Sequence, residues 1–218
     1  MAACGLDALP YWDRIFSNME RPFELHWLIK VLRSRATSGG ACLEVGCGQR
    51  FPGPYLLATC YDRVTAIDLD PGITENEPSE RVAFEIADAT RLPYPDAAFD
   101  DVYSISVVEH FKLGAAAEAL HEIHRVLKPG GRFVGTLGIG DERKSWPGAH
   151  HPDDVYGSRD VRFWVGLMKN TGFRLQVDPH GQGRYNDFLR QLRVSVDARR
   201  GRCREFATYR FVATKPGV

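Results

Sequence analysis

The feature that most constrains this chain is the segment ACLEVGCG, which spans residues 41–48. A short apolar run with an acidic residue, Glu44, near its end is followed by Gly46 and Gly48, with one residue between them. This pattern is typical of a strand that enters a turn whose backbone lies against a ligand. Glycine lacks Cβ, so it can adopt positive φ angles and lets another molecule approach its backbone closely. The segment therefore predicts a nucleotide-like ligand at the end of a strand.

Strand and helix patterns alternate along the rest of the chain. Apolar and β-branched runs predict further strands at residues 63–69, 82–86, 99–105, 132–137, 173–177 and 206–214. Helical spacing of apolar residues predicts helices within residues 11–33, 113–127 and 161–171, and shorter ones near residues 55–57 and 188–192. Such alternation indicates an α/β fold, a doubly wound and mostly parallel sheet with helices on both faces and ligands at the carboxyl ends of the strands.

Length and composition fit a single domain. The 218 residues have a formal net charge of zero, 44% of them are hydrophobic, and no linker-like stretch divides them, which is typical of a soluble globular protein. No apolar run approaches the roughly 20 residues that a membrane helix needs, and residues 1–10 lack a signal-peptide pattern. The five cysteines are scattered without a CxxC pair, so we expect reduced thiols and a cytoplasmic location.

The last part of the chain is basic. From residue 181 onward there are nine Lys and Arg residues against three acidic ones. Such an end could contact RNA or an anionic substrate. No stacking aromatic residues are interleaved with the charges, so a solvated helix face is the preferred interpretation and nucleic acid is not an expected partner.

Asp68 ends the second predicted strand, twenty residues after Gly48. A carboxylate at this place can accept hydrogen bonds from both hydroxyls of a ribose. Alternatively the acid caps the following helix, for which Asp70 is the better candidate. A dinucleotide site would want a third glycine at position 51, where this chain has Phe51, and Glu44 would repel a pyrophosphate. A ligand with a cationic end matches these residues better.

Five motifs in order resemble the class I S-adenosylmethionine-dependent methyltransferases, which have a Rossmann-like core. They are LEVGCG at 43–48, IDLD at 67–70, ADATRLPYPDAAFDDVYS at 87–104, VVEHF at 107–111 and RVLKPGG at 125–131. The resemblance implies a seven-stranded sheet whose last strand is antiparallel, and S-adenosylmethionine as the methyl donor. We divide the single domain, residues 1–218, into an N-terminal helical lid (1–38), a cofactor-binding core (39–137) and a substrate-side region (138–218).

The resemblance also implies roles for individual residues. The glycines would line the methionine part of the cofactor, with Glu44 supporting the glycine loop and the amine, and Asp68 would hold the ribose. Asp88 and Ala89 would face the adenine, and Ser106 would flank the methionine and the sulfonium. The predicted cofactor contacts are Glu44, Gly46, Cys47, Gly48, Asp68, Leu69, Asp88, Ala89 and Ser106, with Tyr11 as either a lid residue or a cap of the core. The family often has glycine at position 50, where this chain has Arg50 and where Gly53 could compensate.

Transfer of a methyl group to a hydroxyl or ammonium requires a general base, and four residues are candidates for this role. They are Glu109 and His110 after the fourth predicted strand, and His150 and His151 in the long segment after the fifth. A metal-assisted alternative would add Asp153, but SVVEH at 106–110 lacks the first acid of the ExxEH sequence found in some methyltransferases, so no metal is predicted. The predicted function is methylation of an oxygen or nitrogen of a small molecule. RNA or protein methylation, and cofactor or partner binding without turnover, are the alternatives.

Overall fold

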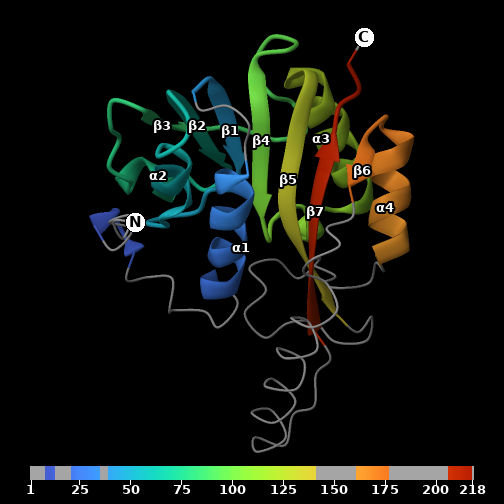
Figure 1. Cartoon of the computed structure of the whole chain (residues 1–218), viewed down its shortest axis with the longest axis horizontal. Helices are drawn as coiled ribbons and strands as arrows, with labels where there is room; N and C mark the ends of the chain where they lie inside the picture. Colours follow the sequence, from blue (N-terminus) through green and yellow to red (C-terminus); the bar gives the residue numbers. More distant parts are fainter. Residues whose placement is uncertain (1–7, 13–20, 35–38, 141–160, 177–205, 218) are drawn as a thin grey trace, which may run out of the picture.

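The computed structural model describes residues 8–12, 21–34, 39–140, 161–176 and 206–217, which are built around a seven-stranded sheet (Figure 1). Its strand order is β3-β2-β1-β4-β5-β7-β6. The strands from β1 to β5 are parallel, and β7 is antiparallel to both of its neighbours. The bounds are β1 Ala41–Val45, β2 Arg63–Asp68, β3 Val82–Ile86, β4 Phe99–Ile105, β5 Leu127–Gly140, β6 Arg174–Gln176 and β7 Phe206–Thr214. The predicted fold class, including an antiparallel last strand, is confirmed.

Helices cover both faces of the sheet (Figure 1). α1 (Arg21–Arg33) and α2 (Gly53–Leu57) pack on one face, and α3 (Leu113–Val126) and α4 (Val161–Asn170) pack on the other. Two 3₁₀ turns, η3 (Pro71–Glu75) and η4 (Val108–His110), follow β2 and β4. α1 buries Trp27, Leu28 and Leu32 against the sheet, as its helical spacing predicts, and it also buries Leu25. No described helix is long and apolar enough to cross a bilayer.

The start of β5 differs from the sequence-based expectation. The PGG at residues 129–131 is predicted to end α3 as a turn, but the strand already begins at Leu127. Two backbone hydrogen bonds of 2.9 Å explain this, because Gly130 N donates to Lys215 O and Lys215 N donates to Gly131 O. The C-terminal end of the chain thus supplies strand-like partners that no local pattern reveals.

Lys215 and Arg210 also correct the interpretation of the basic end as a solvated helix face. Lys215 Nζ donates hydrogen bonds of 2.8 Å to the carbonyl oxygens of His124 and Leu127, so it closes the end of α3. Arg210 lies in β7 with its side chain buried. The predicted helix near residues 188–192 and the other basic residues of this end lie outside the described residues.

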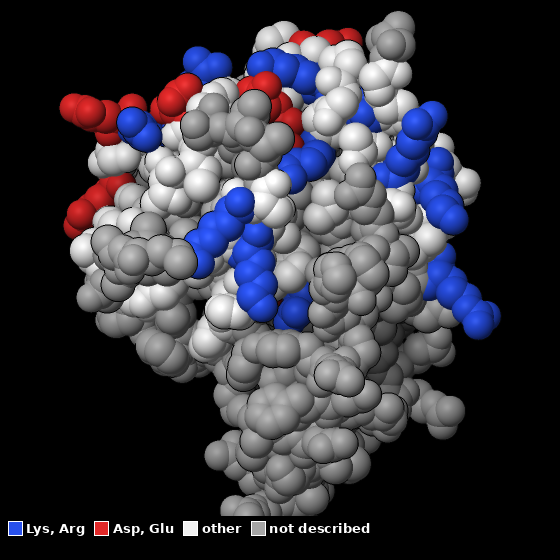
Figure 2. Space-filling view, viewed as in Figure 1, with Lys and Arg blue, Asp and Glu red and all other residues white. Residues whose placement is uncertain are grey.

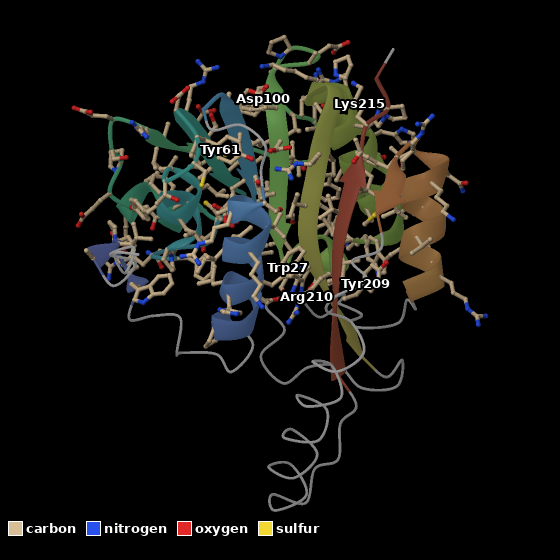
Figure 3. The ribbon with its side chains drawn as sticks, in the orientation of Figure 1. Trp27, Tyr61, Asp100, Tyr209, Arg210 and Lys215 are labelled. Carbon is tan, nitrogen blue, oxygen red and sulfur yellow. The ribbon has the colours of Figure 1, made fainter. Side chains whose placement is uncertain are left out.

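A buried polar network joins the amino ends of the central strands. The Arg132 guanidinium donates two hydrogen bonds to Asp101, of 3.0 and 2.9 Å, and the Tyr61 hydroxyl donates to the same carboxylate. Tyr61 and Tyr103 hydroxyls lie 2.6 Å apart. In Figure 3, Tyr61 lies toward the upper end of the sheet. The carboxyl ends of β1, β2 and β4 lie toward the lower end, where Arg210 is labelled, so the network is remote from them.

Candidate functional site

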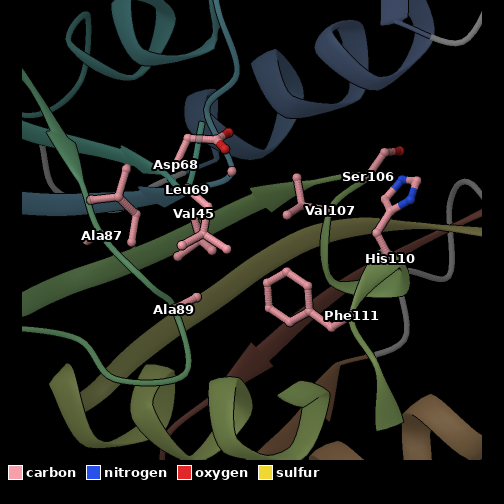
Figure 4. Close-up of a pocket in the computed structure, with 11 residues that line it drawn as sticks. Val45, Asp68, Leu69, Ala87, Ala89, Ser106, Val107, His110 and Phe111 are labelled. Atoms are coloured by element: carbon pink, nitrogen blue, oxygen red, sulfur yellow. The ribbon is translucent and has the colours of Figure 1, made fainter. Parts of the chain in front are cut away.

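A pocket opens at the carboxyl ends of β1, β2 and β4 (Figure 4). The expected site residues among those that line it are Gly46, Asp68, Leu69, Ala89, Ser106 and His110. It is also lined by five apolar residues that the sequence analysis did not single out, namely Val45, Ile67, Ala87, Val107 and Phe111. The structure therefore brings residues from four separate motifs to one concave site.

The two glycines after β1 have different physical roles. Gly46 has a φ of 73°, and a Cβ placed there would lie 2.3 Å from a methyl carbon of Val107. Gly48 has a φ of 66°, but a Cβ there would meet no atom within 4 Å. Gly46 is thus required by the packing of the pocket wall, whereas Gly48 presents its backbone to open space in which a ligand can lie.

Asp68 and Asp70 take separate roles at the end of β2. The Asp68 carboxylate accepts hydrogen bonds from Gly48 N at 2.9 Å and from Asp70 N at 3.1 Å. Asp70 caps η3 by accepting from Gly72 N at 2.8 Å, as expected for the better capping candidate. Each Asp68 oxygen accepts one of these two bonds and retains a further lone pair, so the carboxylate can still accept two hydroxyl protons.

The contacts of the turn after Gly48 explain how this chain can have arginine at position 50, where the family often has glycine. Arg50 has a φ of 52°, a left-handed conformation in which glycine costs least. Its backbone N–H donates to Asn76 Oδ1, and Asn76 Nδ2 donates to Gly48 O at 3.0 Å. Arg50 also pairs with Glu75 at 3.2 Å. Residues of η3 and its end, which the sequence analysis missed, therefore hold a non-glycine residue in the required turn.

Gly53 does not replace the missing loop glycine. A Cβ at Gly53 would lie 2.4 Å from Oε1 of Glu44, so this glycine makes room for the Glu44 carboxylate. Glu44 is only 2% exposed and lies under the loop rather than in the pocket wall. This position agrees with support of the glycine loop; the expected contact with a cofactor amine stays a prediction.

Gly48 and three other expected cofactor residues are not among the residues that line the pocket. Cys47 is buried, and burial together with the negative charges of Glu44 and Asp68 raises the pKa of its thiol, which keeps it neutral. Tyr11 packs on the Tyr55 ring at 5.9 Å between centroids, which is the core-capping alternative. Asp88 is exposed and accepts two bonds of 2.8 Å from Thr90.

The candidate bases separate clearly. His110 lines the pocket, whereas Glu109 is 5% exposed and is not among the lining residues. His150, His151 and Asp153 lie outside the described residues. Within the described ranges, no group of three or more His, Cys, Asp or Glu side chains is arranged to hold a metal ion. The geometry favours His110 over Glu109 as a group that can reach a ligand.

Comparison with known proteins identifies this pocket. Residues 43–135 match the family described as "Methyltransferase domain", a range that contains every described lining residue. The sheet order and the pocket position agree with that match. Residues 43–135 of this chain form a methyltransferase domain. The predicted family and cofactor are thereby confirmed.

Curated relatives of the methyltransferase domain act on different acceptor atoms. A 27-O-demethylrifamycin SV methyltransferase of Amycolatopsis mediterranei is 34% identical over 142 residues, which are 60% of this chain and 49% of that protein. Phosphoethanolamine N-methyltransferase 3 of Arabidopsis thaliana is 28% identical over 174 residues, which are 73% of this chain and 33% of that protein. The chain thus spans half or less of the length of these relatives.

Solved structures share the fold of the methyltransferase domain. An S-adenosylmethionine-dependent methyltransferase from Mesorhizobium loti is 17% identical with a TM-score of 0.62, covering 92% of this chain and 99% of that one. The [4+2]-cyclase SpnF is 22% identical with a TM-score of 0.62, covering 88% of this chain and 82% of that one. Since one of these neighbours is a cyclase by name, the fold alone does not specify a reaction.

The pocket of the methyltransferase domain fits an amino-acid nucleoside. The space beside the Gly48 Cα is open to a ligand, and Asp68 keeps lone pairs for ribose hydroxyls. Leu69 lines the pocket and is 61% exposed, so its apolar side chain is open to contact with a bound ligand. Ala87 and Ala89 give the same wall little bulk, which suits a flat ring. The chemistry of these residues therefore matches S-adenosylmethionine.

Proposed function

We propose that this chain transfers a methyl group from S-adenosylmethionine to an oxygen or nitrogen of a small molecule. The observation that carries the proposal is the convergence of Gly46, Asp68 and Ser106 on one pocket of a methyltransferase domain. Relatives named for an O-methyl position of a rifamycin and for the nitrogen of phosphoethanolamine support a small acceptor. Among the described residues, basic side chains on the face shown in Figure 2 lie over α1, over α4 and along the upper edge of the molecule rather than in one band, which gives no support to RNA as the acceptor.

The chain's own residues would mainly bind and align. When bound, the cofactor supplies a methyl group made electrophilic by its sulfonium. Asp68 would accept the ribose hydroxyls, and Leu69 and Ala89 would contact the adenine. Ser106 and His110 would then face the reacting end of the pocket. Correct alignment of two reactants can lower a barrier by up to roughly 7 to 11 kcal/mol, so no covalent nucleophile is needed.

His110 is the proposed base when the acceptor carries a proton that must leave. An imidazole nitrogen titrates near neutrality and can accept such a proton. His110 lines the pocket and follows β4 on the η4 turn, which places it beside the same wall as Ser106. Glu109, His150 and His151 remain predictions, as does the expected cytoplasmic location.

Titration calorimetry with S-adenosylhomocysteine tests cofactor binding first. We expect saturable heat, and its absence at millimolar ligand would overturn the proposal. Methyl-labelled S-adenosylmethionine with a panel of small alcohols, phenols and amines then tests transfer. Labelled product supports the proposal, whereas cofactor binding without product across the panel favours the non-catalytic alternative.

The role of His110 needs a matched control. We expect His110→Ala to lower kcat by about 10²- to 10⁴-fold with an unchanged dissociation constant for S-adenosylhomocysteine. His121→Ala on α3 serves as the control, because His121 is exposed and is not among the lining residues. Equal rates for the two variants would remove His110 as the base.

A further inference from the structure

A buried carboxylate on α1 reaches the pocket wall from behind. Glu24 is 2% exposed and lies 82 residues before Ser106 in the sequence. Its Oε1 accepts a hydrogen bond of 2.5 Å from Ser106 Oγ and one of 2.8 Å from Thr136 Oγ1. Ser106 itself lines the pocket (Figure 4). One hydrogen bond thus separates Glu24 from the ligand site.

The hydrogen bonds around Ser106 have a defined direction. Its backbone N–H donates to Thr136 Oγ1 at 3.0 Å and to Thr136 O at 3.1 Å, which fixes a residue whose φ is 54°. A hydroxyl has one proton and two lone pairs, and an ionised carboxylate only accepts. Because Ser106 Oγ donates its proton to Glu24, the same oxygen has only lone pairs left for any other partner. On the pocket side, Ser106 is therefore an acceptor.

A buried positive charge lies on the same face of the sheet. Arg210 of β7 stands directly opposite Thr136 of β5 in the antiparallel register, and directly opposed residues share a face. Arg210 is 6% exposed. α1 packs over this face, and the pKa of its His26 is lowered by burial and then by Lys30 and Arg210. Glu24 accepts a hydrogen bond from Thr136, so Glu24 and Arg210 both lie on the face of the sheet to which Thr136 belongs.

We propose that Glu24 is a positioning residue that fixes the Ser106 hydroxyl as a hydrogen-bond acceptor for the ammonium group of the cofactor's methionine moiety. An ammonium has three protons and no lone pair, so it complements an oxygen that offers only lone pairs. The inference rests on the proposed function, since it assumes S-adenosylmethionine in this pocket. It assigns to α1 a task in cofactor binding beyond its packing on the sheet.

Two ligands that differ in the methionine moiety test the assignment. S-adenosylhomocysteine has the ammonium group, whereas 5′-methylthioadenosine has the same adenosine and thioether without it. We expect Glu24→Gln to weaken binding of S-adenosylhomocysteine about tenfold and to leave 5′-methylthioadenosine within about twofold, because a hydrogen bond to a charged group is worth roughly that factor. A general loss of packing would weaken both ligands equally, and that result would overturn the proposal.

Ser106→Ala provides the second variant and does not depend on how Glu24→Gln folds. Alanine and serine both have Cβ, so the backbone at φ 54° is equally constrained in both. We expect the same selective tenfold loss, and no further loss when Glu24→Gln is added, since Glu24 acts through Ser106. Additive losses, or selective loss in neither variant, would overturn the proposal. Failure of the unchanged protein to bind either ligand would instead overturn the proposed function.

Discussion

The backbone N–H of Gly48 donates a 2.9 Å hydrogen bond to Oδ2 of Asp68, twenty residues further along the chain. This bond ties the turn after β1 to the end of β2, two strands that are neighbours in the sheet. The glycine turn and the acidic residue are therefore one unit of the site, so a change at Asp68 affects both the ligand and the shape of the turn that receives it.

Asp68→Ala should weaken binding of S-adenosylhomocysteine by roughly 100-fold, because the ribose hydroxyls lose a charged acceptor. Asp70→Ala is the matched control, since it removes only the cap on Gly72 N. We expect the control to cost about 1 kcal/mol of unfolding free energy while its dissociation constant stays within about twofold. Calorimetry and urea unfolding measure the two quantities. Equal losses of affinity in both variants would contradict the separate roles.

Gly46→Ala should cost about 3 kcal/mol of unfolding free energy, because the new Cβ adds strain at positive φ and collides with Val107. Gly130 offers a control with a φ of 80° and no atom within 4 Å of an added Cβ. Gly130→Ala should therefore cost only the strain, about 1 kcal/mol. Urea unfolding gives both values. Adding Val107→Ala should restore part of the loss at Gly46, and a lack of any rescue would argue against the collision.

Local sequence signals predicted the parts of the site that depend on neighbours in sequence. Gly46 and Gly48 directly follow a strand, and Asp68 ends the next one, so the parallel arrangement places them at one edge of the sheet. The preference for Asp70 over Asp68 as the capping residue also came from position, since Asp70 stands immediately before the first residue of η3.

Other features depend on contacts between distant segments, and the sequence could not predict them. Glu24 lies 82 residues from Ser106, and nothing in the helical pattern of α1 marks it as a buried charge. The early start of β5 depends on Lys215. A general pattern can place an element on a face of the sheet, but it does not specify which side chain of that element meets which residue.

His124 should make stability depend on pH. Its ring packs edge-on against Phe173, Nε2 is buried without a hydrogen bond among the described residues, and burial, followed by Lys215 and His121, lowers its pKa. The unfolded chain then binds the proton more strongly. The stabilising contribution is complete above the unfolded pKa of about 6.5 and is lost as the pH falls toward the lower pKa of the folded state, with a slope of at most about 1.4 kcal/mol per pH unit.

Urea unfolding at pH 7.5 and 5.5 measures this effect. His124→Leu should reduce the loss of unfolding free energy between the two conditions, and the exposed His121→Gln should reduce it much less, because His121 is only the last of the three causes of the lowered His124 pKa. Part of the loss should persist in His124→Leu, because the pKa of His26 is also lowered, first by burial. An unchanged difference between the two pH values in His124→Leu would refute the assignment.

Position 50 should prefer glycine to alanine, opposite to an ordinary exposed position. Arg50 is exposed with a φ of 52°, so Arg50→Ala and Arg50→Gly both remove the exposed pair with Glu75 and differ mainly in backbone strain. We expect Arg50→Gly to be more stable than Arg50→Ala by about 1 kcal/mol. Glu118, exposed within α3, gives the reverse comparison, because glycine there should be less stable than alanine by about 1 kcal/mol. Thermal or urea unfolding of the four variants measures both differences. The same sign at both positions would mean that the turn relaxes when Arg50 is replaced, and that Asn76 does not hold it in the left-handed conformation.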